Sequence, residues 1–429
     1  MQAKQPLELN GDFQYALDLI ENTDKSVFIT GRAGTGKSTL LRLFRNTTRK
    51  KFVITAPTGI AALNVGGQTI HSFFRFPPKP IPRSKIRKIY PMRKLYKSLQ
   101  VLIIDEVSMV RADMMDNIDY FLRLNRNDSR PFGGVQVVFF GDLFQLPPIV
   151  AGDVERQLIE YNYESPYFFS AEVFKTIELE MLELRKVYRQ KERHFLRLLE
   201  TVRLNRADYD DLEDLNVRYD PNAQPGDYAI TISARNAQVN QTNRRELERL
   251  ETGAFIFPAE IEGDFNPALY PTASLLTLKI GAQVMFVKND PEGKFVNGTI
   301  GKVVSLEENL ITVKTNDDQK LIEVAPAEWQ ILKYKISEEN PTEIDTEVVG
   351  TFTQYPLKLA WAVTIHKSQG QTFDRVIIDL GRGAFEHGQT YVALSRCRTL
   401  DGIVLKQPLQ LRDIQVDERV VEFYETNFW

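Results

Sequence analysis

The stretch that decides the fold is Gly31-Arg32-Ala33-Gly34-Thr35-Gly36-Lys37-Ser38, which matches the pattern G-x-x-x-x-G-K-[ST]. It follows an apolar run at residues 27–30 and precedes a helix-like stretch at residues 39–44. Glycines in such a loop let backbone N–H groups turn towards one anion, and the N-terminus of the next helix also favours negative charge. The sequence therefore predicts a strand, a phosphate-binding loop and a helix, in that order.

Two further polar segments complete the site that this loop begins. We expect Lys37 to reach the β- and γ-phosphates of a nucleotide and the Ser38 hydroxyl to ligate Mg²⁺. A second apolar run ends in Asp105 and Glu106, which are placed to hold Mg²⁺ through water and to orient the attacking water. Gln145, just after a later strand, is a candidate for a hydrogen bond to the γ-phosphate. The predicted cofactors are ATP and Mg²⁺.

Apolar runs alternate with helix-like stretches along the chain, as in a parallel sheet that helices cover on both faces. The first series of predicted strands lies at residues 27–30, 52–56, 101–104 and 135–140. The second series lies at residues 228–233, 375–380 and 402–405. The predicted fold class is α/β, with two domains of similar type.

The second series is interrupted by short β-rich pieces and turn residues, which predict a small β-barrel inserted into the second domain. The predicted first domain is residues 1–180, and the predicted insertion is residues 253–351. The second domain is then residues 181–252 together with residues 352–429. A Pro-rich stretch at residues 77–82 predicts an exposed, extended arm.

Charge is distributed unevenly along a chain whose formal net charge is −3. Between Asp24 and Asp105 there is no acidic residue, while seventeen Lys and Arg lie between Lys25 and Lys97. One early segment is therefore strongly cationic, which suits a local phosphate-binding face. The alternative is a phosphate-handling loop with a few solvated lysines.

Composition excludes several other classes of protein. The single cysteine, Cys397, excludes an internal disulfide framework, and with four scattered histidines we expect no zinc site. No apolar run is long enough to cross a bilayer, and the N-terminus has neither a secretory core nor an Arg-rich presequence. We therefore expect no membrane partner and, if the source is bacterial, a cytoplasmic, nucleoid-associated protein.

Eight segments in order resemble motifs of the Pif/RecD-type DNA helicases of superfamily 1, and the resemblance covers nearly the whole chain. These segments are APTGIAA (56–62), QTIHSFF (68–74), IIDEVSM (103–109), RPFGGVQ (130–136), GDLFQLPP (141–148), LRKVYRQ (184–190), TIHKSQG (364–370) and YVALSRCR (391–398). The segment at residues 130–136 favours the Pif branch. The resemblance implies two tandem RecA-like P-loop domains with ATP bound between them.

The resemblance also implies roles for individual residues. Arg189 and Arg396 would reach the γ-phosphate from the second domain, and Gln14 would read the adenine edge. The residues expected to act in catalysis are Lys37, Ser38, Asp105, Glu106, Gln145, Arg189 and Arg396. Those expected to bind the nucleotide are Gln14, Gly34, Thr35, Gly36, Lys37, Ser38, Thr39, Gly370 and Gln371.

Contacts with single-stranded DNA follow from the same resemblance. The residues implied are Pro57, Thr58, Gly59, His71, Ser72, Phe73, Thr364, His366 and Lys367. Phe73, Phe74 and Phe76 could stack on unpaired bases, and a place in the core is an equal alternative for each. A wedge arm at about residues 74–97 would part the duplex, and the insertion resembles a Src-homology-like barrel that closes over the exiting strand.

The implied function is an ATP-dependent DNA helicase that moves 5′→3′ on single-stranded DNA and acts on tailed or forked duplexes, with G-quadruplexes and RNA–DNA hybrids as further substrates. A monomer is expected, because one chain holds both halves of the ATP site. Alternatives are a DNA-stimulated ATPase clamp without unwinding, a RecD-like subunit of a nuclease complex, and a P-loop switch or kinase.

Overall fold

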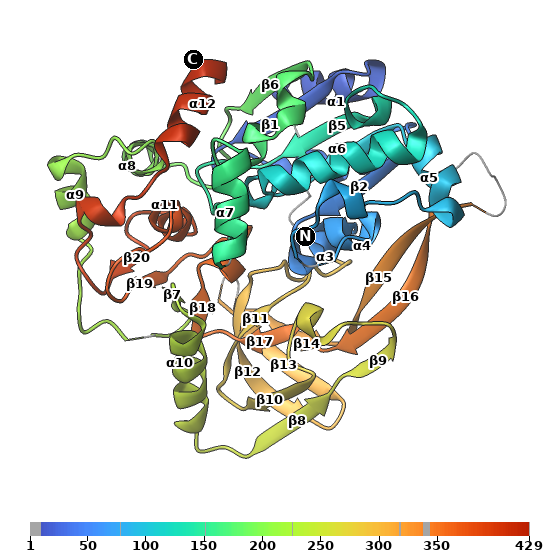
Figure 1. Cartoon of the computed structure of the whole chain (residues 1–429). Helices are drawn as coiled ribbons and strands as arrows, with labels where there is room; N and C mark the ends of the chain where they lie inside the picture. Colours follow the sequence, from blue (N-terminus) through green and yellow to red (C-terminus); the bar gives the residue numbers. More distant parts are fainter. Residues whose placement is uncertain are drawn as a thin grey trace.

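The computed structural model describes residues 10–77, 79–150, 152–224, 226–316, 319–337 and 344–428, arranged as two parallel sheets and an antiparallel region (Figure 1). The first sheet has six parallel strands in the order β3-β2-β4-β5-β1-β6. They are β1 (Ser26–Gly31), β2 (Phe52–Ala56), β3 (Gln68–Thr69), β4 (Val101–Ile104), β5 (Gln136–Phe140) and β6 (Leu179–Leu184). The phosphate loop leaves the end of β1, inside this sheet.

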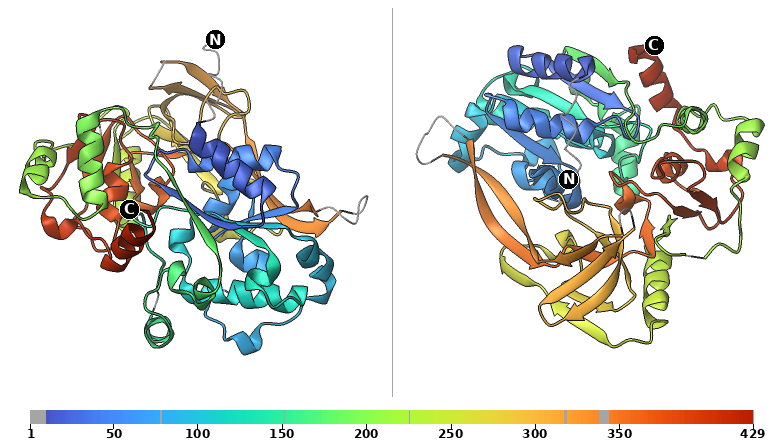
Figure 2. Two further views of the ribbon diagram at one scale, coloured as in Figure 1. Left: turned by 90° about the horizontal axis from the view of Figure 1, so that it is seen from above. Right: turned by 180° about the vertical axis from the view of Figure 1, so that it is seen from behind.

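Helices cover both faces of the first sheet, which explains why its strands are apolar without alternation (Figure 2). Within β1, Val27 and Ile29 pack with α1 (Gly11–Asn22) and α2 (Lys37–Thr47) on one face. Phe28 belongs to the larger core on the other face, which includes residues of α6 (Ala112–Arg126). The loop between β1 and α2 is therefore held by packing on both sides.

The second sheet is smaller and also parallel, with the strand order β18-β7-β19-β20. Its strands are β7 (Ile230–Ser233), β18 (Ala362–Thr364), β19 (Val376–Asp379) and β20 (Ile403–Leu405). The accompanying helices are α8 (Arg193–Arg203), α9 (Tyr209–Asn216), α10 (Asn236–Glu248) and α11 (Gln389–Leu394). The prediction of an α/β protein with two parallel sheets is thus confirmed.

The insertion between β7 and β18 is antiparallel. Its described strands form sheets in the orders β14-β13-β12-β11-β17, β15-β16-β9 and β10-β8. They are β8 (Ala254–Pro258), β9 (Glu260–Gly263), β10 (Leu275–Lys279), β11 (Gln283–Phe286), β12 (Ile300–Glu307), β13 (Leu310–Thr315), β14 (Leu321–Val324), β15 (Ala327–Ile336), β16 (Ile344–Gln354) and β17 (Leu357–Leu359). The sequence-predicted boundary at residue 351 falls within β16.

The long β15–β16 pair of the insertion reaches the first domain (Figure 1). Tyr334 is buried, and its hydroxyl accepts a hydrogen bond from the backbone N–H of Ile54 (3.1 Å). The side-chain amide of Gln68 donates to the backbone oxygen of Leu332. The insertion therefore covers the edge of the first sheet beside β2 and β3.

The chain returns to the first domain at its end. In α12 (Glu418–Phe428), the ring of Phe423 stacks on Phe169 with centroids 4.3 Å apart, and the Tyr424 hydroxyl donates to Glu183 of β6 (2.6 Å). Since β6 pairs with β1, the sequence-predicted domain boundary at residue 180 falls within a strand of the first sheet. No helix in the described part of the chain is long and apolar enough to cross a membrane.

Candidate functional site

The phosphate loop has the backbone shape that its glycines permit. Gly34 and Gly36 have φ values of +84° and +89°, which L side chains rarely adopt. Gly36 is the N-cap of α2 and offers no side-chain acceptor to the first N–H groups of that helix, so these groups can receive a phosphate. Thr35 is buried, and its hydroxyl donates to the backbone oxygen of Arg32 (3.0 Å), which stabilises the turn.

Lys37 reaches back into the loop from the first turn of α2. Its Nζ donates to the backbone oxygens of Gly31 (2.5 Å) and Arg32 (3.2 Å). Burial lowers the pKa of Lys37, while the charges of Asp142 and Glu106 act in the opposite direction. An ammonium group held by carbonyl oxygens can transfer its hydrogen bonds to phosphate oxygens, which carry more negative charge.

Asp105 and Glu106 follow β4 and are partly buried near Lys37. Burial and then the neighbouring Glu106 raise the pKa of Asp105 to about 7, and Lys37 acts against this rise. Burial also raises the pKa of Glu106, with Lys37 and Arg396 opposing it. Glu106 has a φ of +50°, a strained backbone conformation that is frequent at functional sites.

The donor set fits Mg²⁺ that is bound together with phosphates. Ser38 is exposed at the start of α2 and Thr39 is half-buried beside it, while Asp105 supplies a carboxylate. Within the described ranges, no group of three or more His, Cys, Asp or Glu side chains gathers in a way that could hold a metal. Hydroxyl and single-carboxylate ligands with nucleotide phosphates are the usual way in which Mg²⁺ is held.

Asp142, Gln145 and Tyr391 connect the two domains beside the loop. Gln145 Nε2 donates to Asp142 Oδ2 (3.0 Å), and the Tyr391 hydroxyl donates to the same oxygen (3.3 Å). The Tyr391 oxygen also accepts from the backbone N–H of Ala33 in the phosphate loop (2.9 Å). Gln145 therefore lies in a network that includes the loop, as its predicted role requires.

Arg189 and Arg396 come from segments on the far side of the loop. A Cβ at Gly34 would lie 2.5 Å from Cβ of Arg189, so the two backbones are in close contact. Arg189 donates to the backbone oxygen of Ser395 (3.1 Å), and the fully buried Arg396 donates to the backbone oxygen of Val392 (2.9 Å). Burial lowers the pKa of Arg189 to about 9 and of Arg396 to about 10.

Gln14 is exposed on α1, next to a residue that packs on the loop. The Phe13 ring lies 2.9 Å from where a Cβ at Gly36 would stand, and 6.5 Å from the Tyr188 ring between centroids. Asn10 caps α1 by accepting from the N–H of Phe13 (2.8 Å) and donates to the Tyr188 hydroxyl (3.1 Å). Gln14 therefore lies next to a residue that packs on the loop, and its contact with adenine stays a prediction.

Gly370 and Gln371 connect the second domain to the insertion. Gly370 is exposed with a φ of +75°, and Gln371 is buried. The backbone oxygen of Gln371 accepts a hydrogen bond from Arg396 (3.4 Å). The side-chain Nε2 of Gln371 lies 3.5 Å from Oδ1 of Asn297 in the insertion. Gln371, one of the residues expected to bind the nucleotide, is therefore adjacent to one of the two arginines.

Pro57, Thr58 and Gly59 lead from β2 into α3 (Gly59–Val65). Thr58 is exposed and caps α3 with its side chain. Leu269 of the insertion packs so closely that a Cβ at Gly59 would lie 2.0 Å from it. In this conformation the insertion covers part of the predicted DNA-contact segment.

His71, Ser72 and Phe73 lie on the short helix α4 (Ile70–Phe74). Ser72 is exposed, and burial lowers the pKa of the half-buried His71. Phe73 is 0% exposed and packs edge-on against Phe74, Tyr96 and Tyr334. Phe73 is therefore a core residue here, buried with Phe74 and Phe76, and cannot stack on a base.

Thr364, His366 and Lys367 lie at and after the end of β18. Thr364 is buried, and its hydroxyl accepts from the N–H of Lys367 (3.3 Å). Lys367 is exposed, and the half-exposed His366 lies 3.5 Å from Glu386. Lys367 and His366 are therefore accessible to a DNA backbone.

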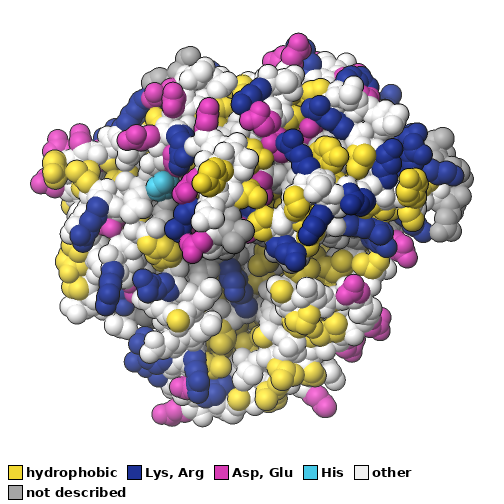
Figure 3. All heavy atoms as spheres, in the orientation of Figure 1, with side chains coloured by type: hydrophobic (Ala, Val, Ile, Leu, Met, Phe, Trp, Pro, Cys, Tyr) yellow, Lys and Arg dark blue, Asp and Glu magenta, His cyan; other side chains and the backbone are white. Residues whose placement is uncertain are grey.

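The predicted arm carries much of the exposed positive charge. In Figure 3, Lys and Arg side chains gather on the right of the molecule, near α5 (Arg93–Ser98). The exposed basic residues of the arm are Arg75, Lys79, Arg83, Lys85, Arg87, Lys94 and Lys97. The concentration of charge predicted from the acid-free segment is thus partly on the surface.

Three residues near the site escaped the sequence prediction. They are Tyr188, Tyr391 and Arg203. The first two lie inside segments that resemble helicase motifs, yet tyrosine has no fixed chemistry by which sequence alone identifies it. Arg203 carried a usable signal, because it falls on the apolar face of α8 with Leu199 and Val202.

Comparison with known proteins places these residues in a family. The chain matches the PIF1-like helicase model over residues 8–211 and the model of the DNA helicase Pif1 2B domain over residues 268–306. It is 36% identical to ATP-dependent DNA helicase PIF1 of Homo sapiens, over 94% of this chain and 61% of that protein. It is 30% identical to ATP-dependent DNA helicase RRM3 of Saccharomyces cerevisiae, over 99% and 68%. The chain thus spans about three fifths to two thirds of the length of these relatives.

Solved structures agree with this assignment. Unliganded Pif1 from Bacteroides sp is similar with a TM-score of 0.90 at 38% identity, and 98% of each chain is covered. Bacteroides Pif1 bound to single-stranded DNA gives a TM-score of 0.69 at the same identity, with 97% of this chain and 96% of that chain covered. On these similarities, the chain belongs to the PIF1-like helicase family.

Proposed function

We propose that this protein is an ATP-dependent DNA helicase that moves along single-stranded DNA and separates duplex strands. The observation that carries the proposal is the meeting of groups from both domains at one site. The Tyr391 hydroxyl of the second domain accepts from the N–H of Ala33 in the phosphate loop (2.9 Å) and donates to Asp142 of the first domain (3.3 Å). The DNA helicases and DNA-bound structures among its relatives support the choice of DNA as the track.

Hydrolysis would use these groups in distinct ways. Lys37 and the first amides of α2 bind the phosphates, and Glu106 orients a water molecule and accepts its proton. Arg189 and Arg396 stabilise the charge that spreads over the transferred phosphoryl oxygens. Mg²⁺ at Ser38 and Asp105 would neutralise phosphate charge when bound. Because the arginines belong to the second domain, hydrolysis depends on how the two domains are placed, and this couples it to movement.

The described conformation fits a DNA-free state. It is more similar to the unliganded Bacteroides relative than to the DNA-bound one, with TM-scores of 0.90 and 0.69. In it the insertion covers Gly59 and buries Tyr334 against the first domain. We infer that the insertion leaves this position when single-stranded DNA binds along Thr58 and Lys367.

Finer features of the proposal rest on the sequence resemblance. They are 5′→3′ movement, action as a monomer, a wedge at about residues 74–97, and a Src-homology-like barrel in the insertion. The division into residues 1–180, 253–351 and the remainder belongs to the same proposal. Tailed and forked duplexes are the expected substrates, as a relative bound at forked DNA supports, and G-quadruplexes are a further candidate.

Strand displacement on matched duplexes with either a 5′ or a 3′ single-stranded tail, with ATP and Mg²⁺, tests this function. Wild type should open only the 5′-tailed duplex. Glu106→Gln should lower the hydrolysis rate by about 10²–10⁴-fold, because it removes the proton acceptor, while DNA binding is kept. DNA-stimulated hydrolysis without displacement would instead indicate a clamp, and no response to DNA would indicate a switch or kinase.

A further inference from the structure

Arg203, the last residue of α8, has a fully buried side chain where the two domains meet. Its guanidinium carbon lies 4.3 Å from the centre of the Phe144 ring and 4.9 Å from that of Tyr424. The two rings exclude water from the charge. Burying a charge in this way lowers stability unless nearby groups compensate for it. An apolar side chain at this position would avoid that cost, so the presence of an arginine calls for an explanation.

Three carboxylates surround Arg203. The shortest approach joins its Nε to Asp142 Oδ1 (3.5 Å), and Glu200 and Glu183 lie at 3.6 and 3.9 Å. Among the described residues, none lies in hydrogen-bond geometry with its three nitrogens, so the attraction is mainly that of charges. Burial lowers the pKa of Arg203, but the nearby charges, above all that of Asp142, raise it above its ordinary value. Asp142 is also fully buried, whereas the two glutamates are partly accessible.

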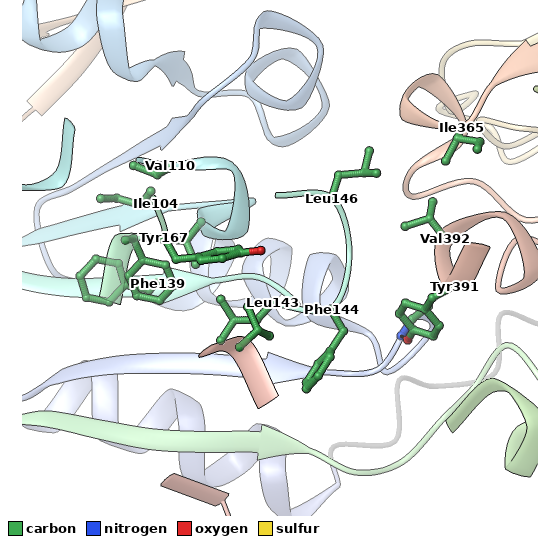
Figure 4. Packing of buried hydrophobic residues seen from close by; sticks show 14 of the residues in the cluster. Ile104, Val110, Phe139, Leu143, Phe144, Leu146, Tyr167, Ile365, Tyr391 and Val392 are labelled. Carbon is green, nitrogen blue, oxygen red and sulfur yellow. Dashed lines mark hydrogen bonds between the residues drawn. The ribbon is translucent and has the colours of Figure 1, made fainter. Parts of the chain in front are cut away.

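Asp142 in turn orients the groups around the nucleotide loop. Its two oxygens accept from the N–H of Phe144, from Gln145 Nε2 and from the Tyr391 hydroxyl. Tyr391 accepts from the N–H of Ala33, and gives its single proton to Asp142. In Figure 4 the Tyr391 side chain extends from α11 towards the segment that carries Phe144. A carboxyl group can accept all three bonds because its two oxygens offer several lone pairs.

We propose that Arg203 is a positioning residue for ATP hydrolysis, which acts through Asp142 on Gln145 and the phosphate loop. A carboxylate can pair with Nε2 of Gln145 but not with its Oε1, because a carboxylate only accepts hydrogen bonds. This sets the orientation of the amide and leaves the second Nε2 hydrogen for a phosphate oxygen. The Tyr391 bond ties the same carboxylate to α11 of the second domain. The inference rests on the proposed hydrolysis of ATP, and concerns a residue that contacts neither nucleotide nor DNA.

A second contact supports the role of α8. Glu200, one turn before Arg203, pairs with Arg32 of the phosphate loop (2.9 Å). One short helix thus holds the loop directly through Glu200 and indirectly through Arg203. A displacement of α8 would disturb both connections at once.

The test replaces Arg203 and measures each kinetic parameter separately. Arg203→Met should lower kcat for hydrolysis stimulated by single-stranded oligo-dT by about 100-fold, the loss typical when one oriented group at a transition state is disturbed. KM for ATP and Kd for the oligonucleotide should change less than about threefold, because Arg203 touches neither ligand. Arg197→Met is the matched control, since the half-exposed Arg197 lies on the same helix and pairs with the buried Asp211 and the half-exposed Asp214. It should keep the wild-type kcat.

A double-mutant cycle separates positioning from a general loss of stability. If Arg203 acts through Asp142, Arg203→Met combined with Asp142→Asn should be no slower than Asp142→Asn alone. The proposal would be overturned if the losses in kcat of the two single variants multiplied in the double variant. An unchanged kcat in folded Arg203→Met would also overturn it. If Arg203→Met does not fold, Tyr391→Phe and Arg203→Lys test the proposal in its place. Both variants should lower kcat at constant KM. Wild-type kcat in both variants would overturn the proposal. A wild-type protein that does not hydrolyse ATP would refute the proposed function instead.

Discussion

Asp105, a proposed ligand of Mg²⁺, carries a cost to stability. Its pKa of about 7 in the folded protein exceeds the ordinary value of 3.8, because burial and Glu106 disfavour the charged form. The folded state then binds the proton more tightly than the unfolded state, so the contribution of this group to stability falls as pH rises from about 4 to 7. The penalty is fully present only well above pH 7.

Removing that charge should therefore stabilise the apoprotein while abolishing hydrolysis. We expect Asp105→Asn to raise Tm at pH 8, to leave it nearly unchanged at pH 4, and to flatten the dependence of Tm on pH. Thermal unfolding across this range without nucleotide measures all three effects. Asp128→Asn is the control, since hydrogen bonds from Arg130 lower the pKa of Asp128 to about 2, below this range. A Tm at pH 8 no higher than that of wild type would contradict the argument.

Residues with obligatory chemistry were predictable from the sequence, and those placed by distant contacts were not. Lys37 belongs to the G-x-x-x-x-G-K-[ST] pattern and Asp105 ends an apolar strand, and the structure brings the two close together. Phe73 could have been core or a DNA platform, and the choice is made by Tyr334, which lies 261 residues later. Tertiary packing of this kind leaves no local pattern.

At the scale of elements, the start of α11 is fitted closely to the segment after β5. Gly388, the N-cap of α11, has a φ of +75°, and a Cβ there would lie 2.3 Å from the backbone oxygen of Gln145 and 2.6 Å from that of Phe144. Neither backbone oxygen can move without disturbing the Asp142–Gln145 pair. The spacing between α11 and this segment is therefore set by the absence of a side chain.

Gly388→Ala should push α11 away from that segment and lower kcat for hydrolysis by at least tenfold. Gly381→Ala is the matched control, because Gly381 has a similar φ of +65° with no atom within 4 Å of the added Cβ. Both variants should lose about 1 kcal/mol or more of stability from backbone strain, and only Gly388→Ala should also lose hydrolysis. Equal kcat values in the two variants would show that the close contact is irrelevant to the chemistry.

The strands of the parallel sheets were easier to predict from the sequence than the arrangement of the strands in the insertion. Strands of the parallel sheets are continuous apolar runs such as residues 101–104, whose burial on both faces is visible in the sequence. In the insertion, β-rich pieces and turn residues indicated short strands, but which strands share a sheet depends on long-range pairing such as that of β9 with β16. That pairing joins residues about ninety positions apart, and no local signal encodes it.

At the scale of the whole molecule, the position of the insertion is an equilibrium that DNA is expected to shift. The docked state buries Tyr334, whose hydroxyl accepts from the N–H of Ile54, a fully buried residue of β2. If DNA binds only the undocked state, the observed association constant is the intrinsic constant multiplied by the fraction of molecules that are undocked. The lower TM-score with the DNA-bound relative is consistent with such a rearrangement.

Tyr334→Phe tests this equilibrium, because it keeps the ring that packs on Phe73 and removes only the hydroxyl that accepts from Ile54. A buried N–H without a partner costs about 1–3 kcal/mol, and that cost falls on the docked state alone. We expect Kd for a fluorescent oligo-dT, measured by anisotropy without nucleotide, to fall by about threefold to tenfold. Gln330→Ala is the control, since Gln330 is exposed on the same strand and its side chain bonds only Glu328 beside it. Weaker binding by Tyr334→Phe would mean that the docked insertion helps to hold DNA, and the proposed order of undocking and binding would then be reversed.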